Sequence, residues 1–322
     1  MARALEAACP NAAPVAPLRV LGEGFFSMAV ATASNHVFRL GTAPMVFERY
    51  RREWRVLPWL ARQRLPLEVP APRWLLEPGG ACPFGGIGYP LIEGRTLTEA
   101  DATGPYAGHL AEQVAAFNRA LHRLPVEEAR ALGVPDGTEV DRAWHETDRG
   151  VSARALAAVL TTEERATIEA WWRGFLEAFE ARTDGGYVPV FTHADIGDEN
   201  LLVALDGTRL LGVIDFEHRA VGEPFNDFRS LVYSGHAFYT AAIGAYERLG
   251  GPSFGDLEGY LEWRWQRGAF RPSVAPGSAT TPSMPTRCAP ACAAIACSEP
   301  PTIEAQRPLP RSYALSLGER AG

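Results

Sequence analysis

Three oxygen-bearing side chains near the middle of the sequence have the types and spacing that magnesium chemistry needs. Asp195 and Asn200 belong to one short segment, and Asp215 follows further along. Carboxylate and amide oxygens are hard donors that suit Mg²⁺, which usually keeps some water and also binds phosphate oxygens. A carboxylate that does not bind the metal could accept the proton of a hydroxyl group. The segment is therefore a candidate magnesium site with a candidate general base beside it.

Short strands on either side would hold these side chains in place. Apolar runs predict strands at Tyr187–Thr192, Leu201–Ala204 and Leu210–Ile214. The dipeptide Asp206-Gly207 is typical of a tight turn between the last two of them. We expect this hairpin to bring Asp215 back beside the other two side chains, on a loop that a rigid scaffold supports.

The amino-terminal region predicts a small β-rich unit with one helix. Two runs rich in valine and phenylalanine predict strands at Phe25–Ala31 and His36–Leu40. Apolar residues at helical spacing predict a helix over Val46–Arg64, which two prolines follow. A further apolar run, Tyr89–Ile92, leads into a connector to the next region.

The second half is mostly helical and then changes in composition. A helical repeat is formed by Leu110, Val114, Phe117, Leu121 and Leu124. A later helix has an aromatic face between Ile168 and Phe179, which we interpret as core because helical spacing is what core packing requires. Residues Pro272–Pro301 are rich in Pro, Ala, Ser and Thr, a composition that predicts disorder.

Composition limits the possible functions. The 322 residues carry 31 basic and 38 acidic side chains, and every basic side chain is arginine. The net charge of −7 argues against a nucleic-acid partner and is compatible with a cationic substrate. No apolar run is long enough to span a membrane. Five cysteines without a paired framework indicate a reducing compartment, so we expect a cytoplasmic protein, while its oligomeric state stays open.

The central motif resembles that of a known family. It reads His-x-Asp, four residues, Asn, a hairpin and then Asp-Phe, from His193 to Phe216. This pattern is similar to the catalytic segment of the aminoglycoside phosphotransferases, relatives of protein kinases that include choline, homoserine and macrolide kinases. The resemblance implies that Asp195 is the catalytic base and that Asn200 and Asp215 are the Mg²⁺ ligands. It implies that His193 braces the catalytic loop by hydrogen bonding rather than carrying a proton.

Other segments extend the resemblance over about Arg19–Phe270. Asp227, preceded by Gly-Glu-Pro, resembles the family segment after the metal aspartate, where it is expected to cap a helix and tie the loop down. A Leu-His-x-Leu run resembles a family helix end, in which His122 would be a buried packing residue. Glu217 departs from the pattern, because protein kinases have glycine at that position.

The resemblance also implies where a nucleotide would bind. A degenerate glycine loop containing Gly22, Gly24 and Ser27 would cover the phosphates. The base would lie against the connector at Leu91 and Ile92, where it would use backbone hydrogen bonds that any side chain permits. The bound nucleotide would be ATP or GTP.

Arg39 occupies the strand position at which kinases place the lysine that binds phosphate. Its planar guanidinium group can bind two phosphate oxygens at once. A carboxylate on the following helix should hold this guanidinium in place. Glu53 is our choice for that partner, and Glu48 is the alternative.

Together these observations predict a two-lobed, protein-kinase-like α+β fold. We expect a disordered amino terminus at 1–18, a small β-rich nucleotide-binding lobe at 19–92 and a mostly helical lobe for catalysis and substrate at 93–270. A low-complexity, disordered tail would follow at 271–322. The tail differs from the family, in which further helices would line the acceptor pocket.

The expected activity is Mg²⁺-dependent transfer of a phosphoryl group from ATP or GTP to a hydroxyl of a small molecule. An aminoglycoside or similar antibiotic is the leading acceptor, and we expect neither a nucleic-acid nor a membrane partner. One alternative is a metal-dependent hydrolase built from His193, Asp195, Asp215 and His218. Another is an inactive nucleotide-binding pseudokinase, suggested by the tail and by Glu217.

Overall fold

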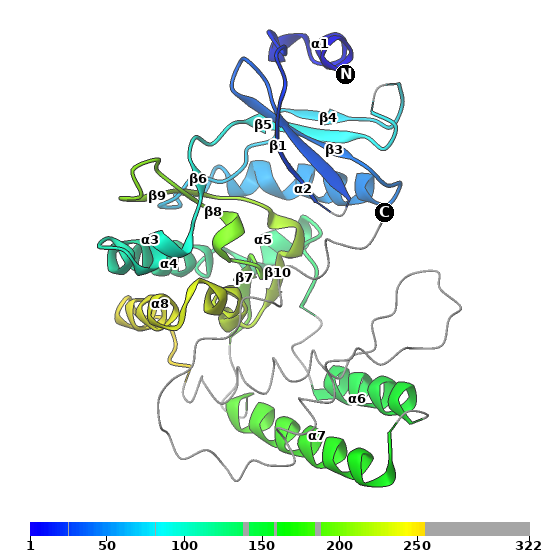
Figure 1. Cartoon of the computed structure of the whole chain (residues 1–322), viewed down its shortest axis with the longest axis vertical. Coiled ribbons are helices and arrows are strands. Elements are labelled where there is room, and N and C mark those ends of the chain that lie inside the picture. Colours follow the sequence, from blue (N-terminus) through cyan, green and yellow to red (C-terminus); the bar gives the residue numbers. More distant parts are fainter. Residues whose placement is uncertain (25, 81, 138–141, 158–159, 184–187, 255–322) are drawn as a thin grey trace. The chain divides into compact units, whose positions relative to one another are not determined.

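The computed structural model describes residues 1–254, apart from residues 25, 81, 138–141, 158–159 and 184–187 (Figure 1). The chain forms two compact units, which we describe separately: Met1–Glu146 with Glu177–Leu261, and Thr147–Leu176 with Glu262–Gly322. The predicted tail at 271–322 and the end of the predicted catalytic lobe lie outside the described residues, as does the first residue of the strand predicted from Tyr187.

The first sheet lies in the amino-terminal part of the chain and is antiparallel, with strand order β1-β2-β3-β5-β4. Its strands are β1 (Arg19–Glu23), β2 (Ser27–Ala31), β3 (His36–Gly41), β4 (Trp74–Leu76) and β5 (Gly86–Pro90). The strands predicted from the valine- and phenylalanine-rich runs correspond to β2 and β3. Because β3 lies between β2 and β5, Arg39 is opposite Ala29 on one side and Ile87 on the other.

The two faces of this sheet carry different clusters, because side chains alternate along a strand. Phe38 and Leu40 of β3 belong to one apolar cluster. Val37 belongs to a second cluster with Tyr50 of helix α2 (Val46–Leu60). Arg39 has the same parity as Val37, so it lies on the face that α2 covers. The alternation along β3 therefore directs Arg39 toward a helix that can supply its partner.

The first 18 residues correct one prediction, because they are ordered rather than disordered. They form helix α1 (Ala2–Ala8) and the 3₁₀ turn η1 (Pro10–Ala12), beside the sheet in Figure 1. Leu5 and Cys9, one helical turn apart, are buried in the cluster of the sheet that contains Phe38. Glu6 Oε1 accepts a hydrogen bond from the Val15 N–H at 3.0 Å. The segment is ordered because it covers the sheet face that α2 leaves open.

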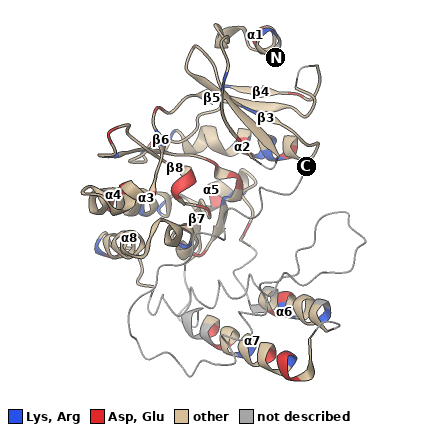
Figure 2. Ribbon diagram, in the orientation of Figure 1, with Lys and Arg blue, Asp and Glu red and all other residues tan. Residues whose placement is uncertain are grey.

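Helix α2 begins at Val46, as predicted, but ends at Leu60 rather than Arg64. Beyond Leu60 the chain tightens: the Arg62 N–H donates to Trp59 O, and the Gln63 N–H donates to Leu60 O. These are bonds to the third preceding residue, which are common where a helix ends. Figure 2 shows basic and acidic positions mixed along α2, so this helix can offer charges of both signs to its neighbours.

The rest of the first unit is mostly helical, with small sheets. Its helices are α3 (Glu99–Thr103), α4 (Ala107–Leu121), α5 (Val126–Ala131) and α8 (His236–Arg248). Its strands are β6 (Arg95–Thr96), β7 (Val190–Thr192), β8 (Leu201–Val203), β9 (Leu210–Val213) and β10 (Ala220–Gly222), in the orders β6-β8-β9 and β10-β7. Its 3₁₀ turns are η2 (Asp198–Asn200), η3 (Phe216–His218), η4 (Pro224–Asp227) and η5 (Arg229–Ser234). Helix α4 confirms the repeat that begins at Leu110, and β8 and β9 confirm the predicted hairpin.

Two long helices, α6 (Arg142–Leu156) and α7 (Thr162–Thr183), follow α5 in the sequence. On α7 the rings of Trp171 and Phe175 stack with centroids 5.6 Å apart, and Trp172 is 1% exposed. The aromatic face is therefore core, as its spacing predicted. Among the described residues, no helix combines the length and the apolar character needed to cross a membrane.

Candidate active site

The loop after β7 carries Asp195 in a half-buried position. Asp195 Oδ1 accepts a hydrogen bond from Ser230 Oγ at 3.1 Å, and Oδ2 lies 3.4 Å from Asn200 Nδ2. The same Asn200 amide group donates to the Asp195 backbone carbonyl at 2.9 Å. Both carboxylate oxygens are thus oriented from within the protein, while the side chain keeps some exposure. Such a carboxylate is well placed to receive a hydroxyl proton.

Asp227 holds the loop that carries Asp195 by accepting hydrogen bonds from its backbone. Its carboxylate is completely buried and accepts the backbone N–H groups of His193 (3.2 Å) and Ala194 (2.5 Å). Ala194 has φ +65°, which is unfavourable for a residue with a side chain and is held here by these bonds. The predicted tie to the loop is therefore present. The predicted helix cap is not, because η5 begins without a side-chain cap at Phe228.

His122 does more than the packing expected of it. The ring is buried, and its Nε2 lies 2.9 Å from Asp227 Oδ2, to which it donates. Its Nδ1 lies 2.7 Å from the Tyr246 hydroxyl on α8. This chain of hydrogen bonds joins α4, α8 and the carboxylate that holds the Asp195 loop. Fully satisfied buried polar networks of this kind fix one arrangement of the groups they connect.

His193 braces the loop, as the resemblance implied. Its Nδ1 accepts the Asp195 N–H at 3.2 Å, and its Nε2 donates to the Ile214 carbonyl at 2.9 Å. These partners fix the neutral tautomer with the proton on Nε2. Burial lowers the pKa of His193, which keeps the ring neutral. With both nitrogens occupied, His193 connects the Asp195 loop to the strand that leads to Asp215.

Asn200 and Asp215 are brought together by the β8–β9 hairpin. The Ile214 N–H donates to the Asn200 carbonyl at 3.0 Å, so the residues that flank the hairpin are hydrogen-bonded neighbours. Asp215 has φ +62°, and its side chain is 43% exposed. In the part of the chain that the structure describes, its Oδ1 is a buried oxygen without a hydrogen bond, although Arg39 Nη2 lies 3.3 Å away.

These two residues suit a magnesium ion, which needs few protein ligands, better than a metal whose ligands all come from the protein. Within the described residues there is no group of three His, Cys, Asp or Glu side chains that could hold a metal. An amide oxygen and a carboxylate with one unsatisfied oxygen leave the remaining positions to water and phosphate. Mg²⁺ is usually bound in this way, with few protein ligands.

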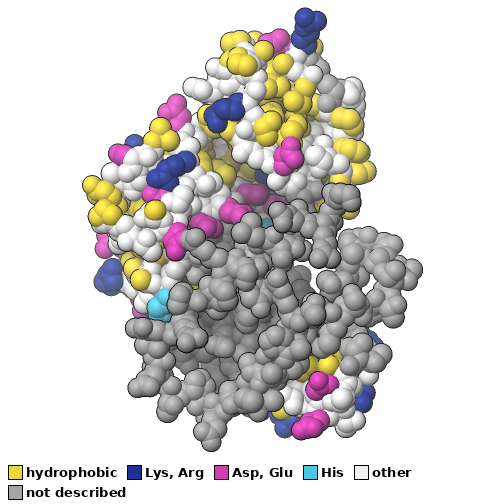
Figure 3. Space-filling model, viewed as in Figure 1, with side chains coloured by type: hydrophobic (Ala, Val, Ile, Leu, Met, Phe, Trp, Pro, Cys, Tyr) yellow, Lys and Arg dark blue, Asp and Glu magenta, His cyan; other side chains and the backbone are white. Residues whose placement is uncertain are grey.

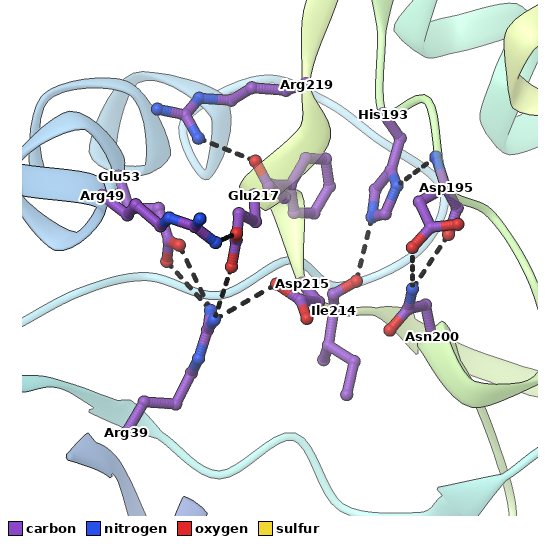
Figure 4. A network of polar contacts seen from close by, with 11 residues as sticks. Arg39, Arg49, Glu53, His193, Asp195, Asn200, Ile214, Asp215, Glu217 and Arg219 are labelled. Atoms are coloured by element: carbon purple, nitrogen blue, oxygen red, sulfur yellow. Dashed lines mark hydrogen bonds and ion pairs between the residues drawn. The ribbon is translucent and has the colours of Figure 1, made fainter. Parts of the chain in front are cut away.

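Arg39 pairs with Glu53, the predicted partner, and not with Glu48. Arg39 Nη1 lies 3.2 and 3.1 Å from the two Glu53 carboxylate oxygens (Figure 4). Glu48 instead pairs with Arg51 on the exposed side of α2. Burial alone would lower the pKa of Arg39, but the charges of Glu53 and Asp215 raise it above its usual value. The guanidinium is therefore a fixed positive charge where the sheet, α2 and the segment at Asp215 meet.

The predicted phosphate loop and base connector lie outside the network of Figure 4. The Gly24 N–H donates to Ser27 O at 2.8 Å, which closes the turn between β1 and β2, and Gly22 pairs with Ala29. In the connector, the Leu91 N–H already donates to Asn35 O at 2.8 Å. In an extended chain the backbone N–H groups of successive residues point to opposite sides. Ile92 is therefore the better candidate for a backbone hydrogen bond to a base.

Sequence reasoning missed two contacts at the site. Ser230, which orients Asp195, lies far along the chain from it, and no spacing rule connects a serine in a 3₁₀ turn with a loop carboxylate. Arg49 of α2 forms an ion pair with Glu217. Arg49 lies one helical turn before Glu53, so the helical repeat could have placed it on the same side of α2.

A family model and several solved structures are similar to this chain. The model of the phosphotransferase enzyme family matches residues 29–265. The GDP and kanamycin complex of APH(2″)-IIIa has a TM-score of 0.68 at 21% identity, over 83% of this chain and 88% of that chain. The streptomycin–ATP–APH(2″)-IIa complex has a TM-score of 0.63 at 19% identity, over 83% and 88%. Macrolide 2′-phosphotransferase MphH from Brachybacterium faecium has a TM-score of 0.62 at 23% identity, over 84% and 90%.

No curated protein sequence matches the chain significantly. The structural likenesses confirm the predicted kinase-like α+β fold, with a β-rich amino-terminal part and a mostly helical carboxy-terminal part. The family match includes Arg39, Asp195, Asn200 and Asp215, and it confirms the predicted phosphotransferase. The chain therefore belongs to the phosphotransferase enzyme family.

Proposed function

We propose that this phosphotransferase moves the γ-phosphoryl group of ATP or GTP to a hydroxyl of a small molecule, with Mg²⁺ as cofactor. The observation that carries the proposal is the organisation around Asp195. Its two carboxylate oxygens are oriented by Ser230 and Asn200, and Asn200 is hydrogen-bonded through its carbonyl to the residue before Asp215. A candidate base and two candidate metal ligands thus form one connected unit.

Each residue has a role that its contacts support. Asp195 takes the proton of the substrate hydroxyl and aligns the hydroxyl oxygen for in-line attack. Asn200 and Asp215 would hold Mg²⁺, which neutralises phosphate charge when it is bound. Arg39, kept charged and held by Glu53, positions the phosphates. In-line transfer depends mostly on such positioning and on charge stabilisation, which these residues provide.

An amino-bearing antibiotic is the acceptor class that we favour. Asp198 is half-buried and Glu199 is exposed, both on the turn η2 that follows Asp195. Figure 3 shows several further acidic side chains on the surface of the first unit. Such a field attracts a polycation. The related structures contain kanamycin and streptomycin, and one relative is a macrolide phosphotransferase.

The hydrolase alternative has less support. It would need His193 as a metal ligand, but both ring nitrogens of His193 are already hydrogen-bonded within the protein. His218 is exposed. The pseudokinase alternative drew on Glu217, whose carboxylate forms ion pairs with Arg39 and Arg49.

The test is ADP or GDP release with Mg²⁺ in the presence of aminoglycosides, macrolides, peptide antibiotics, choline or homoserine. We expect stimulation by at least one aminoglycoside and a loss of about a thousandfold in kcat for Asp195→Asn, since that variant removes the base. Asp206→Asn, at an exposed position in the turn of the β8–β9 hairpin, is the matched control and should keep kcat within about twofold. Wild-type turnover by Asp195→Asn would contradict the assignment.

A further inference from the structure

Glu217 lies between two arginine side chains of the amino-terminal part. Its Oε2 is 3.7 Å from Arg39 Nη2, and its Oε1 forms an ion pair with Arg49 Nη1 of α2. Figure 4 shows both guanidinium groups directed toward this one carboxylate. The turn η3, which directly follows Asp215, is thus joined to β3 and to α2 at once.

Arg49 has a second contact, with the loop between β1 and β2. Its guanidinium carbon lies 4.7 Å from the centre of the Phe26 ring, a cation–π distance. Phe26 lies between Gly24 and Ser27, in the loop proposed to cover the phosphates. Its carbonyl accepts the Thr42 N–H at 2.9 Å. One side chain therefore contacts both the phosphate loop and the turn after the metal aspartate.

This arrangement differs from an ordinary surface ion pair. The side chains of Arg49 and Glu217 are 33% and 20% exposed, whereas those of Arg51 and Glu48, on the same helix, are 48% and 61% exposed. Arg39 and Arg49 repel each other, and partial burial weakens the screening of that repulsion. The Glu217 carboxylate offsets it and keeps two positive charges together.

We propose that Arg49, Glu217 and Phe26 form a charge clasp that positions the phosphate loop over the nucleotide. Glu217 holds Arg49 beside Arg39, and Arg49 holds the loop through Phe26. This inference rests on the proposed function, because it presumes phosphates beneath the loop. It gives Glu217, which departs from the kinase pattern, a positioning role. Arg49 supplies a second cation at the phosphate end of a site that contains no lysine.

The first experiment measures hydrogen exchange in the nucleotide-free protein. The Gly24 amide, which donates to Ser27 O, reports on closure of the loop. Arg49→Met should speed its exchange by about fivefold or more, because the loop loses its contact with α2. Arg51→Met removes an arginine from the exposed side of the same helix and should leave the rate within about twofold.

The second experiment measures the Kd of a non-hydrolysable Mg²⁺–nucleotide by calorimetry and the KM in turnover. Arg49→Met should weaken nucleotide binding by about tenfold with kcat within about threefold, and Glu217→Gln should act in the same direction. The double variant should weaken binding by less than the two single effects combined, because both single variants remove the same ion pair between Arg49 and Glu217, although Glu217 also contacts Arg39. Additive effects, or an Arg49→Met that behaves like Arg51→Met, would overturn the clasp.

The two readouts separate the clasp from the proposed function. If the wild-type protein binds no nucleotide, the proposed function is wrong, and so is the role of the clasp in positioning the phosphate loop. The Gly24 exchange rate would then still show whether Arg49 holds the loop. Faster exchange in Arg49→Met with unchanged nucleotide affinity would reduce the contact to a structural one and would also overturn the proposal.

Discussion

The two halves of the candidate site are held by different forces. The Asp195 loop is fixed by hydrogen bonds between backbone groups and a completely buried carboxylate, that of Asp227. The region around Arg39 is fixed by ion pairs with Glu53, Asp215 and Glu217. Backbone hydrogen bonds define one geometry, whereas phosphates and Mg²⁺ can compete with ion pairs. The candidate base Asp195 is therefore held in one geometry before any ligand binds, while the proposed phosphate side around Arg39 can adjust to a ligand.

Removal of Asp227 should produce the largest effect on stability. Asp227→Ala leaves two buried N–H groups and the ring of His122 without an acceptor, so we expect a loss of about 3–5 kcal/mol in the free energy of unfolding. Urea denaturation measures this loss. Asp227→Asn keeps one acceptor oxygen and should lose less. If Asp227→Ala unfolds at the wild-type urea concentration, the loop is held by other contacts.

The ion-pair region should respond differently, because its two partners can be removed together. Arg39→Met leaves the Glu53 carboxylate buried without the Nη1 group that both of its oxygens contact, and should cost about 3 kcal/mol of unfolding free energy. Arg39→Met with Glu53→Met should recover most of that stability, while neither protein binds nucleotide well. Thermal or urea unfolding, combined with nucleotide titration, tests both statements. A double variant less stable than Arg39→Met would show that the pair is not self-contained.

What the sequence could predict follows the same division. The spacing of Asp195, Asn200 and Asp215 was sufficient because one hairpin joins them, and hairpins are encoded locally. The Arg39–Glu53 pair was predicted from the resemblance to kinases, with Glu48 as the alternative, and the structure shows the pair with Glu53. Local patterns therefore predicted strands β2, β3, β8 and β9, the start of helix α2 and the apolar repeat of α4.

Contacts between distant segments could not be predicted. Residues 1–18 are ordered because α1 packs on an apolar face of the first sheet. The alanine-rich segment alone does not reveal that this face is present. The ion pair of Arg49 with Glu217 and the bond from Ser230 to Asp195 join segments far apart in the chain. The hydrogen bond from the Leu91 N–H to the Asn35 carbonyl depends on strand register. These features arise from tertiary packing rather than from local preference.

The buried, neutral His193 should make stability depend on pH. Because burial lowers its pKa below the ordinary value of 6.5, the unfolded chain binds a proton that the folded protein does not. The free energy of unfolding is therefore undiminished by His193 above pH 6.5. It falls as the pH decreases from there toward the folded pKa, by up to about 1.4 kcal/mol per pH unit. His193→Gln can keep both hydrogen bonds without titrating, and it should reduce this slope. Equal slopes in urea titrations at pH 5 to 8 would assign the effect to other groups.

Ser230 should give the smallest effect and test the Asp195 side most directly. Ser230→Ala removes one hydrogen bond to Asp195 Oδ1, while the contact from Asn200 to Oδ2 remains. We expect kcat to fall by about threefold to tenfold, corresponding to about 1 kcal/mol, with the nucleotide KM unchanged. Ser230→Thr retains a hydroxyl and should recover most of the rate. The comparison with Arg49 is informative, since its loss should change nucleotide affinity and leave kcat nearly intact. If Ser230→Ala raised the nucleotide KM instead, the two halves of the site would not be separable, and the base would depend on the ion pairs.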